Sequence, residues 1–127
     1  MAARTQEARL TDIIQACDRL QTLLATCKLD TFERDWQQQW LVERGIEIIS
    51  EASRHLSDDL KTRHPQIPWR SVAGVGNILR HSYERVAPDI LWTLVQLELP
   101  ALEKICRDEL VRDSNGIGPS GGLEPAL

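Results

Sequence analysis

Apolar residues recur at three- and four-residue steps along most of the chain, which is the spacing of amphipathic helices. Strand-like alternation of β-branched residues is scarce. The first such segment, from Glu7 to about Thr26, carries one apolar stripe made of Leu10, Ile13, Ile14, Cys17, Leu20 and Leu24. The pattern predicts an all-α protein whose first helix covers this segment.

A second and longer helical pattern follows. Its apolar positions are Trp36, Trp40, Leu41, Ile48, Ile49, Ala52, Leu56 and Leu60. Asp30 or Thr31 can cap its start, because short oxygen-bearing side chains accept the first free amide hydrogens of a helix. We expect this helix to reach Arg63, and its length favours a kink near Gly45.

Prolines predict the remaining boundaries. Pro65 disfavours helical geometry in the residue before it, and Pro68 suits the first position of a helix that continues to about Arg85. Pro88 starts a fourth helix, to about residue 112, in the same way. Pro100 removes one backbone donor inside that helix, so a bend is expected there. The resulting fold class is an antiparallel helical bundle of four to five helices.

A chain of 127 residues is long enough for one domain with a real core. We expect the helical domain to span residues 1–113. Residues 114–127 contain four glycines, two prolines and little to bury, which is typical of a disordered or expression-derived tail.

The net charge of −4 argues against indiscriminate nucleic-acid binding through a basic surface, although it leaves room for a local basic pocket. The three cysteines, Cys17, Cys27 and Cys106, have no metal-type spacing, which favours free thiols in a reducing cytoplasm. No segment has the apolar length of a signal region or a membrane span. We therefore expect a cytoplasmic protein with no membrane contact, no metal and no cofactor.

The candidate chemistry gathers in the segment Gly76-Asn77-Ile78-Leu79-Arg80-His81-Ser82-Tyr83. On a helix, Asn77 and His81 share a face that Arg85 continues, while Arg80 lies on a neighbouring strip. Histidine has an unperturbed pKa near neutrality, which suits His81 to acid or base catalysis. Arg80 and Arg85 suit a phosphate, and an amide such as Asn77 can orient an imidazole.

A structural interpretation of the same residue types stays open. A lone histidine on an amphipathic helix is more often a hydrogen-bonding residue of the scaffold than a catalyst. We expect His55 and His64 to be surface residues, and the cysteines to be inert packing groups. The four tryptophans are expected to be core or interface anchors.

Several short motifs, in this order and spacing, resemble the HepT-like branch of the HEPN superfamily. They are Gly45-Ile46-Glu47-Ile48-Ile49-Ser50-Glu51-Ala52-Ser53, His64-Pro65-Gln66-Ile67-Pro68-Trp69, Asn77-Ile78-Leu79-Arg80-His81-Ser82-Tyr83, Leu91-Trp92 and Leu99-Pro100-Ala101-Leu102. The resemblance covers roughly residues 8 to 110. It implies a small all-α homodimer whose motifs face a shared cleft, and many such proteins are metal-independent endoribonucleases. They act as toxins beside a minimal nucleotidyltransferase antitoxin.

The family's catalytic pattern is an Arg, four to six residues, and a His, often followed by any residue and a Tyr. His81 and Tyr83 match this pattern, whereas Gly76 stands where the Arg is expected. The resemblance implies that His81 is catalytic and that the antitoxin attaches AMP to Tyr83. From side-chain chemistry we add Arg80 and Asn77 as catalytic residues and Arg85 as a residue that binds the RNA substrate. The alternative is a catalytically inactive dimerisation module that binds the nucleotidyltransferase.

Overall fold

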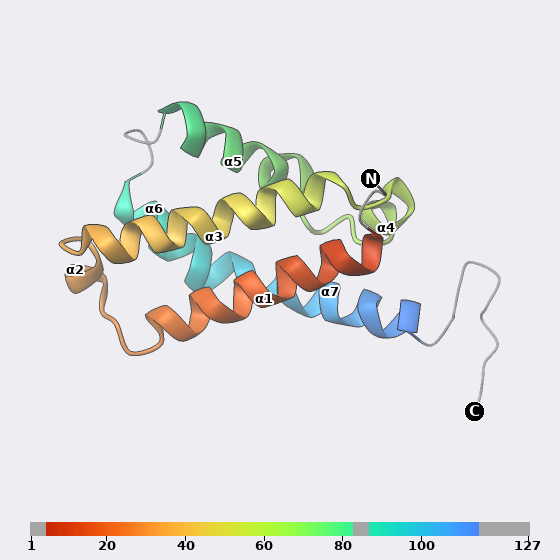
Figure 1. The fold of residues 1–127 in the computed structure, drawn as a ribbon, viewed down its shortest axis with the longest axis horizontal. Coiled ribbons are helices and arrows are strands. Elements are labelled where there is room, and N and C mark those ends of the chain that lie inside the picture. The colour runs from red at the N-terminus through yellow and green to blue at the C-terminus, as the bar shows by residue number, and fades with distance from the viewer. Residues whose placement is uncertain (1–4, 83–86, 115–127) are drawn as a thin grey trace.

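The computed structural model of the protein describes residues 5–82 and 87–114, and every regular element within these ranges is helical. The bundle consists of α1 (Gln6–Leu24), α3 (Trp36–Arg54), α5 (Trp69–Ser82) and α7 (Leu99–Ser114). These helices run alternately up and down. Helix α3 lies beside α1, α5 packs along α3, and α7 packs along α1 (Figure 1). The predicted all-α antiparallel bundle is confirmed.

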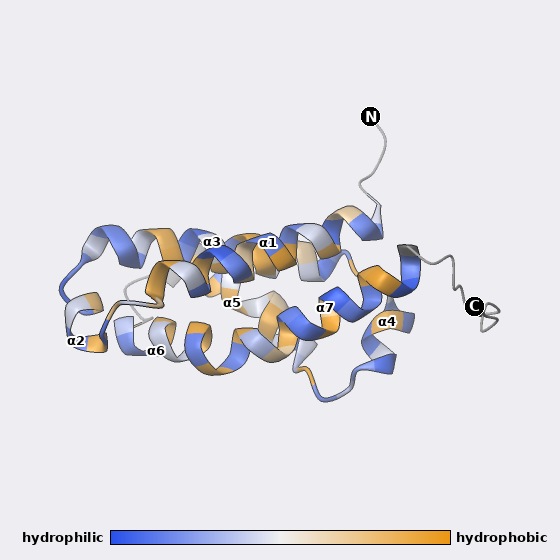
Figure 2. Cartoon of the chain, turned by 90° about the horizontal axis from the view of Figure 1, so that it is seen from below, coloured by the Kyte–Doolittle hydropathy of each residue, from blue (hydrophilic) through white to orange (hydrophobic). Residues whose placement is uncertain are grey.

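The core forms where the apolar faces of these helices meet. Each helix alternates hydrophilic and hydrophobic segments, as amphipathic helices do (Figure 2). The buried side chains include Leu10, Ile13, Leu20, Val42, Ile46, Ile49, Leu79, Leu102 and Ile105. Full burial of a side chain of this size contributes about 1.5–3 kcal/mol, so the sum of these contacts holds the bundle together.

Helix α1 follows the predicted stripe closely, from Gln6 to Leu24. The Oγ1 atom of Thr5 accepts a hydrogen bond from the Ala8 N–H at 3.0 Å, which satisfies one free donor of the first turn. Every member of the predicted apolar stripe is buried. The sequence pattern therefore predicts this helix within two residues.

The prediction of one long helix from residue 30 or 31 to Arg63 is wrong, because this segment forms three helices. A short helix, α2 (Leu29–Phe32), comes first, and α3 begins only after Asp35, whose Oδ1 accepts from the Gln38 N–H at 3.1 Å. Helix α3 ends at Arg54, and α4 (Asp58–Arg63) starts afresh with Ser57 as its cap. Two side-chain caps thus divide the segment where the apolar periodicity alone runs on.

Gly45 does not kink α3, which is continuous from Trp36 to Arg54. Instead, Gly45 is buried against Leu20 of α1. A Cβ atom on Gly45 would lie 2.7 Å from both methyl carbons of Leu20, closer than real Cβ contacts. The glycine is therefore needed for the close approach of α1 and α3, and not for flexibility.

Helix α5 starts directly after Pro68, as predicted, and runs to Ser82. The prediction that it continues to Arg85 reaches residues 83–86, which lie outside the described residues. Its position along α3 is antiparallel (Figure 1). The motif residues Asn77, Arg80 and His81 therefore lie toward the same end of the bundle as α2 and the start of α3.

Pro100 interrupts regular helical geometry, as expected. Helix α6 (Pro88–Thr93) leads into a π-helical turn, η2 (Leu94–Glu98), and α7 then begins at Leu99. The Leu99 N–H donates to the carbonyl of Leu94, five residues back. A wider turn just before the proline fits its missing N–H and its bulky ring.

Helix α7 extends to Ser114, one residue into the predicted tail, and residues 115–127 lie outside the described residues. Within the part of the chain that the structure describes, no helix combines the length and apolar character needed to cross a membrane.

Candidate functional site

The structure places the central motif in the second half of α5. The helix is regular from Asn77 to His81, so these two positions share one face, and the Asn77 side chain is exposed to solvent. Arg80 and His81 occupy the last turn before Ser82. The other two predicted site residues, Tyr83 and Arg85, lie outside the described residues.

A buried hydroxyl of α3 bonds to the backbone of α5 just before this motif. Ser50, which is 1% exposed, donates from Oγ to the Ala73 carbonyl at 2.7 Å. The same Oγ accepts a hydrogen bond from the Gly76 N–H at 3.1 Å. Arg54, one turn further along α3, donates from Nη2 to the Ala73 carbonyl at 3.0 Å. Three hydrogen bonds from two side chains thus join α3 to the single turn 73–76 of α5.

Gly76 itself is buried and carries no side chain toward the site. Its position is the one where the catalytic pattern described above has an arginine.

An apolar groove of about 570 Å³ lies on another flank of α5. It is lined by Ile46 and Ile49 of α3 and by Val72 and Val75 of α5. The lining from α6, η2 and α7 includes Ile90, Leu94, Leu99 and Leu102. Helix α5 therefore packs closely on α3 but is separated from α6 and α7 by open space.

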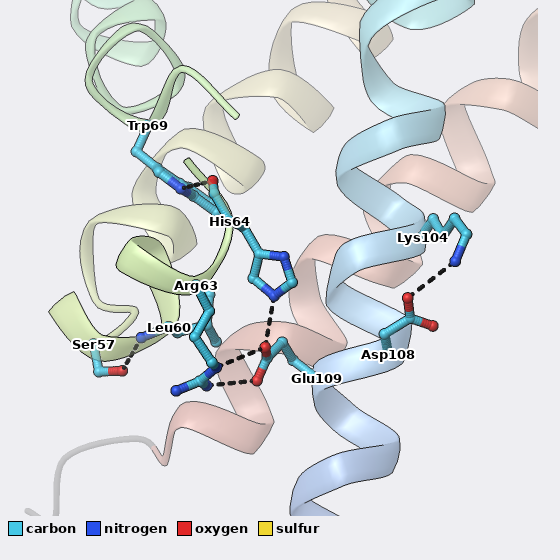
Figure 3. Close-up of polar contacts among 8 residues, drawn as sticks. All are labelled: Ser57, Leu60, Arg63, His64, Trp69, Lys104, Asp108 and Glu109. Carbon is cyan, nitrogen blue, oxygen red and sulfur yellow. Dashed lines mark hydrogen bonds and ion pairs between the residues drawn. The ribbon is translucent and has the colours of Figure 1, made fainter. Parts of the chain in front are cut away.

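A second polar cluster ties α4 and the following loop to α7 (Figure 3). Glu109 is only 4% exposed, and Arg63 donates to it twice, from Nη2 to Oε1 at 2.7 Å and from Nε to Oε2 at 3.1 Å. The His64 Nε2 lies 2.6 Å from Oε2 of the same carboxylate. The cluster anchors the segment that leads into α5, where the Trp69 indole N–H donates to the His64 carbonyl at 3.0 Å.

The pKa of Glu109 reflects two opposing effects. Burial alone raises it, but the hydrogen bonds and positive charges of Arg63 and His64 outweigh burial and hold the pKa below its ordinary value. The prediction that His64 is a surface residue is wrong, because its side chain is 18% exposed and bonded to this carboxylate. His55 does lie on the surface, where its Nε2 is 3.0 Å from Glu51.

The tryptophans divide into two pairs. Trp69 and Trp92 are partly buried against the core. Trp36 and Trp40, by contrast, are 57% and 64% exposed and stack edge to face with ring centroids 4.8 Å apart. Two large exposed rings at one place on a small protein are typical of a contact surface.

The cysteines are free thiols, and two of them are packing groups as predicted. Burial raises the pKa of Cys106 to about 12 and raises the pKa of Cys17 further still. A thiol that stays protonated is a poor nucleophile, so these two cysteines are chemically inert. Across residues 5–82 and 87–114, no three His, Cys, Asp or Glu side chains are arranged to hold a metal ion.

Comparison with known proteins identifies the family. Residues 13–109 match the model of the family described as "Ribonuclease HepT-like". The chain is 34% identical over 100 residues to the "Probable ribonuclease HepT" of Thermococcus cleftensis, covering 79% of this chain and 91% of that protein. It is also 30% identical over 104 residues to a "Putative RNase" of Methanocaldococcus jannaschii, covering 82% of this chain and 95% of that protein.

No solved structure gives a significant match. The family match nevertheless spans most of the chain, and the chain belongs to the HepT-like ribonuclease family. The resemblance that the sequence motifs indicate is thereby confirmed.

Sequence reasoning missed two polar contacts that hold α5, one beside the motif and one at the start of the helix. Ser50 lies among the apolar residues of 46–52. A small polar residue in such a stripe indicates a buried hydroxyl that needs a hydrogen-bond partner. Glu109 gave no local signal, because its partners Arg63 and His64 lie about 45 positions earlier in the chain.

Proposed function

We propose that this protein is a HepT-like toxin and a metal-independent endoribonuclease whose active cleft lies at a homodimer interface. The observation that carries the proposal is the match of residues 13–109 to the HepT-like ribonuclease family. The exposure of the Asn77 side chain also supports it, because Asn77 shares a helix face with position 81, so a ligand can approach this face from solvent.

In this proposal an RNA 2′-hydroxyl attacks the adjacent phosphorus, and the bond from phosphorus to the 5′-oxygen breaks. His81 takes the proton from the 2′-hydroxyl or gives one to the leaving oxygen. Arg80 stabilises the charge on the phosphorane, Asn77 orients the imidazole, and Arg85 binds a neighbouring phosphate. The products are a 2′,3′-cyclic phosphate and a 5′-hydroxyl, so the substrate must be RNA.

The proposed partner is a minimal nucleotidyltransferase that acts as the antitoxin. It transfers AMP from ATP to the phenol oxygen of Tyr83, two residues after His81, and pyrophosphate leaves as the new bond to phosphorus forms. The added bulk and negative charge beside the cleft repel RNA phosphates. After co-expression of the two proteins, mass spectrometry should find AMP on Tyr83, and an unmodified Tyr83 would contradict this step.

The second candidate function is a catalytically inactive helical module that dimerises and binds the same nucleotidyltransferase. One observation favours it: position 76, where the family's pattern has an arginine, is a buried glycine. In this case the fold and the partner surface remain, and the phosphate-binding cation is lost.

A substrate test separates the two candidates. Purified protein in EDTA is incubated with an RNA and with the 2′-O-methyl form of the same sequence. The ribonuclease proposal predicts cleavage of the RNA alone, with cyclic phosphate ends identified by mass spectrometry. No cleavage of either strand would favour the inactive module, and cleavage of both would exclude attack by the 2′-hydroxyl.

A further inference from the structure

The turn 73–76 of α5 immediately precedes the motif, and its backbone is bonded to another helix. In a regular α-helix the N–H of residue 76 pairs with the carbonyl four residues earlier. Here the Gly76 N–H reaches the Ser50 hydroxyl at 3.1 Å, and that hydroxyl donates to the Ala73 carbonyl at 2.7 Å. Both hydrogen-bonding functions of one buried side chain are therefore used on the backbone of the motif helix.

The sequence of this turn explains why its stability depends on the hydrogen bonds from Ser50. Gly74 and Gly76 lie in this turn, and glycine is the least helix-favouring residue after proline. Gly74 gains no packing in return, since a Cβ atom there would meet nothing within 4 Å. The turn that carries the motif is thus intrinsically weak and depends on bonds from outside the helix.

Among the helices around α5, α3 provides the hydrogen bonds that stabilise the turn 73–76. The helix packs along α3, while the groove of about 570 Å³ separates it from α6, η2 and α7. Apolar contacts with α3 hold α5 in place along one side. Directional hydrogen bonds to its backbone atoms further restrict rotation and sliding of α5 along α3.

We propose that Ser50 is a positioning residue of the ribonuclease site, which fixes the rotation and register of the motif end of α5 relative to α3. Arg54 assists through its bond to the Ala73 carbonyl at 3.0 Å. Residues 76 and 80 share one strip of the helix, and His81 follows directly, so any rotation at Gly76 is passed to both motif side chains. The inference rests on the proposed function for its catalytic consequence, but its structural part can be tested alone.

The test compares Ser50→Ala with Ser53→Ala in the full-length protein. Ser53 is a matched control because it is equally buried, at 1% exposed, and lies on the same helix. Its hydroxyl, however, donates to the Ser50 carbonyl within α3. Both variants lose one buried hydroxyl. Only Ser50→Ala loses the hydrogen bonds from that hydroxyl to the backbone of α5.

Amide hydrogen exchange measured by NMR is the first readout. Ser50→Ala should speed exchange of the Gly76 N–H by about tenfold, while Ser53→Ala should leave it within about twofold of wild type. Equal exchange at Gly76 in wild type and Ser50→Ala would overturn the inference. So would an equal acceleration in the two variants, because the effect would then be general loss of stability.

RNA cleavage is the second readout. Ser50→Ala should lower kcat by about tenfold or more with KM within about twofold, because misplacing a reacting group costs rate without removing binding. Ser53→Ala should retain wild-type kcat, and an equal fall of kcat in both variants would contradict positioning by Ser50. If wild type cleaves no RNA, the proposed function fails, and the exchange rate at Gly76 still decides whether Ser50 fixes α5.

Discussion

The guanidinium of Arg63 donates two hydrogen bonds to the carboxylate of Glu109, at 2.7 and 3.1 Å, and thereby ties the end of α4 to the middle of α7. His64 adds a third contact to the same carboxylate at 2.6 Å. The segment that follows leads through Pro68 into α5. This ion pair, in which the carboxylate is buried and the guanidinium is partly exposed, therefore helps to set where the motif helix begins.

Removing Glu109 should destabilise the protein strongly. Glu109→Ala removes the carboxylate that accepts from Arg63 and contacts His64, and losing hydrogen bonds to a charged group costs about 1.5–3 kcal/mol in the free energy of unfolding. Urea unfolding followed by circular dichroism measures the loss. The matched control is Asp108→Ala, which breaks an exposed pair with Lys104 and should cost less than about 1 kcal/mol. Similar decreases in the free energy of unfolding for the two variants would contradict the stabilising role of Glu109.

Stability should also fall in acid through this carboxylate. The pKa of Glu109 in the folded protein lies below its ordinary value of 4.5, so the unfolded chain binds the proton first. The contribution of Glu109 is present above pH 4.5 and is lost as the pH falls through the lower folded pKa. The free energy of unfolding of Glu109→Gln should therefore depend less steeply on pH below 4.5 than that of wild type. If the free energy of unfolding depends on pH equally in wild type and Glu109→Gln, the lowered pKa of Glu109 is contradicted.

Two glycines should respond oppositely to alanine. Gly45→Ala places a methyl group 2.7 Å from the methyl carbons of Leu20 and should destabilise the protein by about 1–3 kcal/mol. Gly74→Ala fills open space on α5 and should stabilise it by up to about 1 kcal/mol through helix propensity. Thermal unfolding of both variants gives the comparison. A stabilised Gly45→Ala would mean that α1 and α3 do not approach closely there.

The protein should be a dimer in solution. Trp36, Trp40 and Leu41 are each more than half exposed, which leaves more apolar surface uncovered than a small monomer usually shows. Light scattering at micromolar concentration should give twice the chain mass of 14.4 kDa. A species of 14.4 kDa alone would contradict the dimeric cleft in the proposed function.

The sequence predicts the parts of the fold that depend on local signals. The apolar stripe of α1, the start of α5 after Pro68 and the distortion near Pro100 all follow from residues close together in the chain. The break before α4 also had a local signal, because Ser57 precedes two aspartates, but the continuing apolar periodicity hid it. The sequence predicts Asp30 or Thr31 as the cap of this segment, whereas Asp35 caps α3 in the structure.

The features around the site depend on contacts between distant segments, and no pattern along the chain contains them. Ser50 meets Ala73 and Gly76 only because α3 and α5 pack antiparallel. His64 is recognised as a partner of Glu109 only after α7 has folded back over α4. Residue types indicate which chemistry is available, whereas helix packing decides which groups meet.

Replacing His81 tests the central claim most directly. His81→Ala is compared with wild type and with His55→Ala, which removes an exposed histidine paired with Glu51 on α3. Cleavage of RNA in EDTA is followed by gel electrophoresis. The account predicts that His81→Ala loses at least about a hundredfold in rate, as expected when a general acid or base is removed, while His55→Ala cleaves as wild type does. Equal cleavage by wild type and His81→Ala would contradict it.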